Sequence, residues 1–291
     1  MSIFFCSSNC DLGREKMRQL EIENFDVPYS FEGKRYNYSS AKKFDYDKFY
    51  DQLKNGAELM PMTVQDYVKA LQPCMDAGED VLLLHTNKKL NPSYQNLKQA
   101  ILELKTKYPE RIIKRVDSYS LSLGFGLIAY DVALRYKKGE KIEDIFKQVK
   151  SLRKQYATYI MLDSYKSLEK IGKAPKSERP VSIALNIKPI LTLSNFGEWV
   201  NCNNAVGRKK GLAELLDKLV KMGENIADYP IGISHCNCQK DAEALADMIH
   251  KKFGEDIQIW IRPMSPDMSC LLGLGALTLS FRCKKREEVS R

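Results

Sequence analysis

The sequence of 291 residues lacks any long hydrophobic run. No uninterrupted apolar stretch approaches the roughly 18 residues that a membrane-spanning helix needs, so we expect no integral membrane segment. Residues 3–6 are apolar, but they have no basic lead and are too short for the core of a signal peptide, so they predict a first strand. Internal repeats and low-complexity tracts are lacking as well. We therefore expect a folded protein of the cytoplasm.

The chain also lacks paired cysteine motifs. Its eight cysteines are scattered and form no repeated Cys-x-x-Cys pairs, which indicates free thiols rather than a disulfide framework. The one close group is a His-Cys-Asn-Cys run at residues 235–238, and a four-ligand metal site there would need further partners. No motif couples a cysteine to a base that would make it a nucleophile. We expect neither a metal nor another cofactor.

Motifs for binding nucleic acid are missing too. The 46 basic and 37 acidic residues give a net charge of +9, which raises the question of a nucleic acid or an anionic membrane. Most of the positive charge is interleaved with acidic residues, as in residues 137–144, and only residues 208–210 and 284–286 are compact basic groups. No zinc finger or aromatic-basic platform is visible. A solvated basic surface explains the charge, and we expect no nucleic-acid partner.

Short apolar runs alternate with helical periodicity through the first half of the chain. This alternation is typical of an α/β domain with a mostly parallel sheet and helices on both faces. A small β excursion interrupts it within residues 20–44. The expected strands are residues 3–6, 81–84, 112–116 and 158–162, and the expected helices are residues 45–56, 63–71, 93–107, 122–136 and 141–156.

The second half of the chain has a different rhythm. A hairpin is followed by two strand–helix units and a last strand, which favours an α+β domain with a mixed sheet. The expected strands are residues 185–191, 198–201, 230–235, 257–261 and 277–282, with helices at 165–171, 207–222 and 241–253 and a glycine-punctuated bend at 271–276. We place the boundary at residue 160, which gives an N-terminal α/β domain of residues 1–160 and a C-terminal α+β domain of residues 161–291.

Two expected helices begin with residues that suit an anion site. Asn91 is a good N-cap residue, and Pro92 suits the first turn of the helix that follows the strand at 81–84. Thr63 is a credible N-cap residue with Asp66 as a capping-box partner. Free N–H groups and the helix dipole can hold a phosphate or a carboxylate at such points. Plain caps with nothing bound explain both segments as well.

Gly124 and Gly126 stand at the start of another expected helix. They resemble a nucleotide-binding loop only in part, because the third glycine of the dinucleotide fingerprint is missing. Glycines at this spacing are more typical of close packing between a helix and its neighbours.

Six short motifs follow one another in the order in which they occur in the DegV family, and they span essentially the whole chain. Each motif is weak alone, and the ordered set carries the resemblance. The matching segments are 8–12 (Ser-Asn-Cys-Asp-Leu), 61–65 (Pro-Met-Thr-Val-Gln), 90–95 (Leu-Asn-Pro-Ser-Tyr-Gln), 117–126 (Asp-Ser followed by Ser-x-Gly-x-Gly), 186–190 (Asn-Ile-Lys-Pro-Ile) and 273–275 (Gly-Leu-Gly). The sequence therefore resembles a member of the DegV family.

The resemblance implies a lipid carrier rather than an enzyme. It implies one long-chain fatty acid in a buried tunnel between the two domains, with its carboxylate available to a separate fatty-acid kinase. Burial of the acyl tail contributes about 0.8 kcal/mol per CH₂, whereas a carboxylate that is buried without polar partners is strongly destabilised. By their match to the family motifs, the residues implied to hold the head group are Thr63, Asn91, Ser93 and Lys173.

The sequence departs from the family pattern at several positions. Asn91 and Ser93 stand where the family has serine and threonine, and Lys173 replaces the arginine of a Gly-Gly-Arg element. Leu271 replaces a histidine, and Ser7 replaces the first aspartate of the initial motif. A lysine presents a point charge where an arginine presents a fork. We therefore expect tail binding to be kept and a doubly charged acyl phosphate to be held less well.

The alternative hypothesis is an enzyme that acts on a small phosphorylated substrate at the same sheet edge. Such an enzyme needs a general base or a nucleophile, and His85 is the histidine nearest that edge. The position of His85 at a strand end is explained as well by packing. A basic nucleic-acid-binding module is a third hypothesis, which a binding assay at low salt would test.

Overall fold

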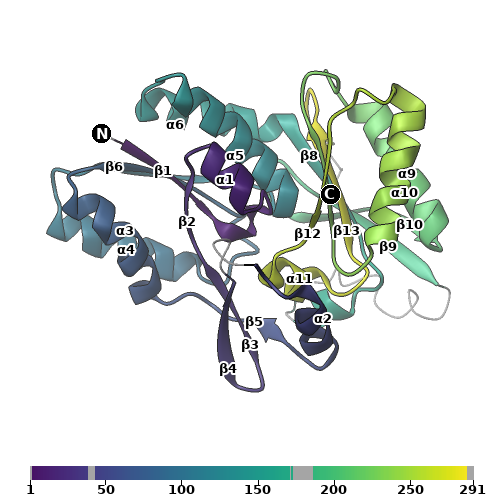
Figure 1. Ribbon diagram of the computed structural model, residues 1–291, viewed down its shortest axis with the longest axis horizontal. Coiled ribbons are helices and arrows are strands. Elements are labelled where there is room, and N and C mark those ends of the chain that lie inside the picture. Colours follow the sequence, from purple (N-terminus) through teal and green to yellow (C-terminus); the bar gives the residue numbers. More distant parts are fainter. Residues whose placement is uncertain (1, 39–42, 171, 173–185, 287–291) are drawn as a thin grey trace.

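The computed structural model describes residues 2–38, 43–170, 172 and 186–286. Three sheets organise these residues: a four-stranded parallel sheet, a six-stranded mixed sheet and a three-stranded antiparallel sheet. The two large sheets lie on either side of the molecule, and the small sheet lies below them in the view of Figure 1. The α/β class that the sequence predicts is confirmed, with a parallel sheet followed by a mixed one.

The parallel sheet has the strand order β2-β1-β6-β7. Phe4 and Leu82 face one side, where they pack with α1, α5 and α6, whereas Phe5 and Leu83 face α3 and α4 on the other side. Adjacent residues of a strand point to opposite faces, so both faces of this sheet are covered, as predicted. The elements are β1 (Ser2–Ser7), β2 (Glu23–Phe25), β6 (Asp80–His85), β7 (Ile113–Asp117), α1 (Arg14–Gln19), α3 (Val64–Asp76), α4 (Tyr94–Lys107), α5 (Ser122–Lys137) and α6 (Ile142–Leu152), with a 3₁₀ turn, η1 (Ser8–Cys10), after β1.

The mixed sheet has the strand order β10-β9-β8-β13-β11-β12, and its pairs are antiparallel except for β11 with β12. Helices α9 and α10 cover one of its faces. The elements are β8 (Tyr156–Met161), β9 (Ile187–Leu193), β10 (Trp199–Val206), β11 (Ile231–His235), β12 (Ile259–Pro263), β13 (Leu277–Arg282), α7 (Lys166–Lys170), α9 (Arg208–Met222) and α10 (Gln239–Phe253), with a second 3₁₀ turn, η2 (Arg153–Gln155), before β8. The predicted hairpin and the strands and helices after it are confirmed.

One strand belongs to a different sheet from the one that the sequence predicts. The alternation of elements assigns residues 158–162 to the parallel sheet, but β8 pairs antiparallel with β9 and β13 inside the mixed sheet. All six residues of β8 are buried, and a strand buried on both faces has the same apolar pattern in either kind of sheet. The chain therefore passes from one large sheet to the other before Tyr156, and the division at residue 160 stays a prediction.

The small sheet is the expected β excursion, extended by a third strand. It consists of β4 (Lys34–Tyr38), β3 (Val27–Phe31) and β5 (Glu58–Leu59), and α2 (Tyr46–Lys54) lies beside it. A short helix, α11 (Pro266–Leu272), contacts β3, β5 and α2, so the small sheet closes over a helix that belongs to the far end of the chain. Helix α11 was not predicted from the sequence, which indicated only a bend from residue 271 onward.

Helix α5 lies between the two large sheets and packs closely on both. A Cβ atom at Gly124 would overlap the hydroxyl of Thr158 on β8 and lie 2.9 Å from Oγ of Ser280 on β13. At Gly126 it would overlap the backbone carbonyl of Cys10. The close-packing interpretation of these two glycines is therefore confirmed, because a side chain at either position has no space.

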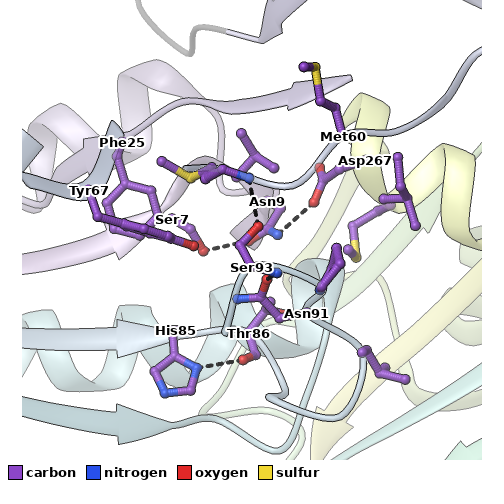
Figure 2. Close-up of a pocket in the computed structure, with 16 residues that line it drawn as sticks. Ser7, Asn9, Phe25, Met60, Tyr67, His85, Thr86, Asn91, Ser93 and Asp267 are labelled. Atoms are coloured by element: carbon purple, nitrogen blue, oxygen red, sulfur yellow. Dashed lines mark hydrogen bonds between the residues drawn. The ribbon is translucent and has the colours of Figure 1, made fainter. Parts of the chain in front are cut away.

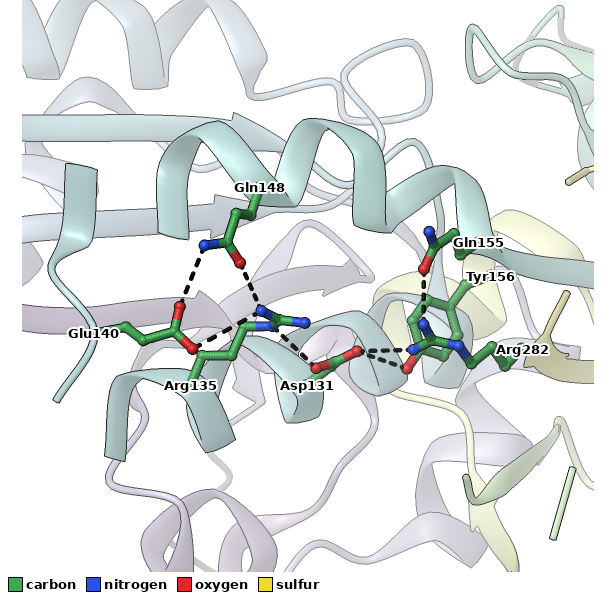
Figure 3. A network of polar contacts seen from close by, with 7 residues as sticks. All are labelled: Asp131, Arg135, Glu140, Gln148, Gln155, Tyr156 and Arg282. Carbon is green, nitrogen blue, oxygen red and sulfur yellow. Dashed lines mark hydrogen bonds and ion pairs between the residues drawn. The ribbon is translucent and has the colours of Figure 1, made fainter. Parts of the chain in front are cut away.

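A polar network ties α5 to the mixed sheet, and Figure 3 shows its members. Asp131 of α5 accepts hydrogen bonds from Arg282 on β13 and from the Tyr156 hydroxyl on β8, both at 3.2 Å. Arg135, one turn later, donates to Asp131 and to Gln148 of α6. The side chains of Asp131 and Arg282 are only 12% and 16% exposed, so salt screens this pair less than a surface ion pair. The network therefore ties α5 and α6, which pack on the parallel sheet, to β8 and β13 of the mixed sheet.

We predict that Gly124→Ala destabilises the protein because the new methyl group must displace Thr158 and Ser280. Overpacking of this kind costs about 1–3 kcal/mol of unfolding free energy. Urea unfolding followed by circular dichroism measures the loss. Leu134→Ala on the same helix is the control, because Leu134 is 38% exposed and its truncation should change the unfolding free energy much less. Equal stabilities of Gly124→Ala and the unmodified protein would contradict the packing described here.

Candidate functional site

A small cavity, which we call the edge cavity, lies where the parallel sheet meets α11 (Figure 2). Its wall comes from the carboxyl ends of β1 and β6, from the segments before α3 and α4, and from α11. Ligands of open α/β sheets bind at this edge of the strands. The lining residues are Ser7, Asn9, Phe25, Val27, Leu59, Met60, Met62, Tyr67, His85, Thr86, Leu90, Asn91, Pro92, Ser93, Asp267 and Met268.

A second cavity, which we call the large cavity, lies between α2, β5, α7 and α11. Its volume is about 530 Å³, whereas the edge cavity measures about 20 Å³, the space of one water molecule. Leu59 lines both cavities. The resemblance implied one buried tunnel. The described residues line two cavities that share this leucine, and the larger of them is open to solvent on one side and has four charged lining residues. The large cavity is lined by Leu53, Lys54, Ala57, Glu58, Leu59, Lys166, Ser167, Lys170, Cys270, Gly273 and Leu274.

A turn before α4 brings two predicted site residues together at the edge cavity. Oδ1 of Asn91 accepts a hydrogen bond from the Ser93 N–H at 2.8 Å, and Oγ of Ser93 accepts one from the Met62 N–H at 2.7 Å. The helix begins at Tyr94 with Ser93 as its N-cap residue, so the expectation that Asn91 caps it was wrong. The Asn91 side chain closes the preceding turn instead, as asparagine commonly does.

Thr63 is the N-cap residue of α3, as predicted. Its hydroxyl accepts a hydrogen bond from the Asp66 N–H at 3.1 Å, and the Asp66 carboxylate accepts one from the Thr63 N–H at 2.8 Å, which completes a capping box. Thr63 is exposed and does not belong to the lining of the edge cavity, although its neighbour Met62 does. The structure thus places Thr63 beside the cavity, with its hydroxyl oxygen engaged in capping the helix.

Tyr67 is a lining residue that the sequence analysis missed. Burial raises the pKa of its hydroxyl to about 12, and hydrogen bonding to Ser93 and Asn91 offsets part of this effect. The hydroxyl therefore stays protonated and lies beside both residues. Its position one turn into α3, four residues after Thr63, puts it on the same helix face as the cap.

A buried polar chain, also missed from the sequence, closes the cavity at the α11 side. The Ser7 hydroxyl donates to Oδ1 of Asn9, and Nδ2 of Asn9 donates to Oδ2 of Asp267, both at 2.6 Å (Figure 2). Asp11 accepts from the Ser265 N–H at 3.0 Å and from a serine hydroxyl of α5. Burial is the main cause that raises the pKa of Asp267 and of Asp11, the latter to about 7.

His85 lies at the end of β6 and is buried against the cavity. Its Nδ1 is 2.7 Å from the backbone carbonyl of Thr86, and its ring lies 5.5 Å from that of Tyr94. Burial lowers the pKa of His85 to about 4, so the ring is neutral near neutral pH, and Nδ1 carries the proton that it donates to Thr86. The packing interpretation of this histidine fits the contacts.

No lysine or arginine is among the described residues that line the edge cavity. Lys173, the predicted cation, lies outside the residues that the structure describes. Leu271, which stands where the family pattern has a histidine, is fully buried in the apolar cluster around α11. The described residues contain no cluster of three or more His, Cys, Asp or Glu side chains suited to a metal ion. No helix among them has both the length and the apolar character to cross a membrane.

Sequence comparison matches this chain to one family along most of its length. A family model described as "Uncharacterised protein, DegV family" matches residues 5–284. A DegV domain-containing protein of Clostridium perfringens is 31% identical over 255 residues, which cover 86% of this chain and 87% of that protein. A second such protein, from Lactococcus lactis, is 23% identical over 96% of this chain and 97% of its own length.

Solved structures of similar proteins share the whole fold. A DegV family protein of Ruminococcus gnavus refined with vaccenic acid has a TM-score of 0.83 and 21% identity, and the match covers 96% of this chain and 99% of that one. The fatty acid kinase (Fak) B3 protein of Streptococcus pneumoniae, loaded with linoleic acid, has a TM-score of 0.83 and 20% identity over 98% of this chain and 100% of that one. At such identities the likeness establishes the fold.

We predict that His85 stays neutral in the folded protein well below the usual pKa of histidine. Its ring carbon resonances in NMR should titrate near pH 4 in the native state and near pH 6.5 in urea. Because the unfolded chain binds the proton first, His85 should make the protein less stable as the pH falls from about 6.5 through 4. Titration of the native His85 ring near pH 6.5 would contradict its burial.

Proposed function

The chain belongs to the DegV family, and we propose that it binds one long-chain fatty acid between its two large sheets, with the carboxylate at the edge cavity. One observation carries the proposal: hydrogen-bonding side chains and the starts of α3 and α4 meet at the edge cavity, and apolar side chains from β5, α11 and the segment before α3 line the space beside them. This arrangement suits a ligand with a small polar head and a long hydrocarbon tail. The fatty acids in the similar R. gnavus and S. pneumoniae structures support it.

Asn91 and Ser93 are the proposed anchors of the head group. The Asn91 amide and the Ser93 hydroxyl carry N–H and O–H groups, and their own oxygens already accept backbone hydrogen bonds. Hydrogen bonds to an ionised carboxylate contribute about 1.5–3 kcal/mol each. The Thr63 hydroxyl next to the cavity can add another. Lys173 stays a proposed cation for the same group.

The tail is proposed to enter the apolar layer that joins the edge cavity to the large cavity. Leu90 and Met268 of the edge cavity belong to the same buried cluster as Ala57 of the large cavity, and Leu59 packs against it. The volume of the large cavity falls in the range of about 300–1,000 Å³ that is typical of ligand sites. Met60, Met62 and Met268 line the narrow part, and such flexible side chains re-pack easily around a guest.

The proposed role is that of a cytoplasmic carrier, not a catalyst. A carrier of this kind can present the carboxylate to a fatty-acid kinase, a role that the name of the S. pneumoniae protein supports. An enzyme at the same edge would need a general base, and His85 is buried with its Nδ1 bonded to a backbone carbonyl. No contact of His85 favours that alternative.

We predict that the protein retains an acyl chain when it is purified from cells supplied with fatty acids. Native mass spectrometry should show one added mass of a long-chain fatty acid per chain, because burial of its tail contributes about 0.8 kcal/mol per CH₂. Denaturation followed by lipid analysis identifies the chain. Protein that carries no lipid from such cells and takes up none from added palmitate would contradict the proposal.

We predict that Asn91→Asp weakens the binding of palmitate at least tenfold. The variant keeps the oxygen that accepts the Ser93 N–H, but it replaces an amide donor with a negative charge beside the carboxylate. Isothermal titration calorimetry measures the affinity. Hexadecanol, which has the same tail and no charge, should bind both proteins with similar affinity.

Asn203→Asp on β10 is the matched control for this prediction. Oδ1 of Asn203 also accepts a backbone N–H, that of Asn204 at 2.8 Å, on an exposed strand away from the edge cavity. The Asn203→Asp variant should bind palmitate with the same affinity as the unmodified protein. An Asn91→Asp variant with unchanged palmitate affinity would show that the head group lies elsewhere.

A further inference from the structure

Asp267 has one carboxylate oxygen without a hydrogen-bond partner at the edge cavity. Asp267 is only 2% exposed and lines the cavity from α11. Oδ2 accepts a hydrogen bond from the Asn9 amide. No group forms a hydrogen bond of normal geometry with Oδ1. The Ser265 hydroxyl and the backbone N–H groups of Asp267 and Met268 lie close enough to favour the charged form, but none of them forms a hydrogen bond of normal geometry with Oδ1, and the Ser265 hydroxyl is itself buried and unbonded. A buried oxygen in this state costs free energy unless a ligand satisfies it.

The cavity gives Asp267 no opposite charge. None of its described lining residues is a lysine or an arginine, and His85, the histidine among them, is neutral. A second carboxylate placed in this space would face Asp267 across a water-sized gap. Two carboxylates in one buried site do not both stay ionised, and they hold one proton between them. A fatty acid and Asp267 would form such a pair.

Resting on the proposed function, we infer that Asp267 holds the head group through one proton shared between its Oδ1 atom and the ligand carboxyl group. The proton balance is simple. When both carboxyl groups are ionised before binding, the complex takes one proton from the solvent, and no covalent bond forms or breaks. Asn91 and Ser93 then donate to the second oxygen of the ligand. Asp267 would thus be a specificity-determining residue that admits a carboxylic acid or an uncharged donor and disfavours a permanently charged head.

Few other groups around Asp267 can change charge near neutral pH. Asp11, from the segment between β1 and α1, has a pKa of about 7. Tyr38 of β4 and Tyr67 of α3 have pKa values raised to about 12 by burial, and burial also raises the pKa of Cys270 on α11. His85 of β6 titrates near 4. Between about pH 7.5 and 9, a proton bound together with the ligand is therefore assigned to Asp267 and the fatty acid.

The one proton bound with the ligand sets the direction in which the palmitate affinity changes with pH. Above the pKa of Asp267 in the free protein, a proton must be bound with the ligand, so the affinity for palmitate falls about tenfold per pH unit. Below that pKa, Asp267 already carries the proton, and the affinity levels off. Asp267→Asn supplies an uncharged amide of the same shape, so its palmitate affinity should not depend on pH in this range.

Calorimetric titration of the delipidated full chain with palmitate tests the inference. Titrations up to about pH 9, in two buffers with different ionisation enthalpies, count the protons bound per ligand. We expect close to one proton at the alkaline end for the unmodified protein and close to none for Asp267→Asn. Asp247→Asn, which removes an exposed aspartate of α10, should behave like the unmodified protein.

The outcomes separate this inference from the proposed function. Palmitate binding without proton uptake by the unmodified protein, at a pH where carbon NMR shows the Asp267 carboxyl group ionised in the free protein, overturns the shared proton and leaves the carrier function standing. Equal proton uptake by Asp267→Asn does the same. Failure of the unmodified protein to bind palmitate at any pH overturns both. The proton count of the unmodified protein decides the question even if Asp267→Asn does not fold.

Discussion

Two buried carboxyl groups at the junction of the sheets constrain the rest of the structure. Asp11 follows the first strand and Asp267 lies in the first turn of α11, and both need hydrogen-bond donors because a buried carboxyl group without them is strongly destabilised. The donors come from the opposite side of the junction: Asn9 bonds Asp267, and the Ser265 backbone bonds Asp11. These bonds join residues more than 250 positions apart. They set α11 against the carboxyl edge of the parallel sheet, which is where the edge cavity forms.

The sequence could predict most elements but not how some of them pair. Apolar periodicity found the strands and helices of both large sheets, and turn residues found the hairpin at Asn195 to Gly197. The apolar pattern placed β8 in the wrong sheet because a fully buried strand has the same pattern in either kind of sheet. The pairing of β8 with β9 and β13 depends on residues far away in the sequence. The apolar pattern missed α11 because this helix is buried on nearly all sides and has no polar face. The Ser265-Pro266 start was the available signal, since proline favours the first helical position.

The residues of the candidate site could be proposed only in part, for a similar reason. Local chemistry pointed to Thr63 and Asn91, because caps and turns near a helix start are visible in a few consecutive residues, and the match to the DegV motifs added Ser93. Asn9 and Asp267 join the site only through tertiary packing, and nothing in either short segment signals the other. The narrow edge cavity is equally a property of packed side chains. Methionines line this cavity, and their flexible side chains can re-pack. A space that now fits one water molecule can therefore widen to admit an acyl tail.

The position of Asp267 bears on one departure from the family pattern, the leucine at position 271. Leu271, where the family pattern has a histidine, lies one turn after Asp267 on the same face of α11 and is fully buried in the apolar cluster. This face of α11 therefore carries a leucine where the family pattern has a histidine, and its carboxyl group stands one turn closer to Asn9. The two kinds of group differ in charge: a histidine can meet a carboxylate as a cation, whereas an aspartate can meet it only by sharing a proton. Under the proposed sharing of one proton, a head-group site with Asp267 tolerates one negative charge in total, which disfavours a doubly charged acyl phosphate more strongly than a fatty acid.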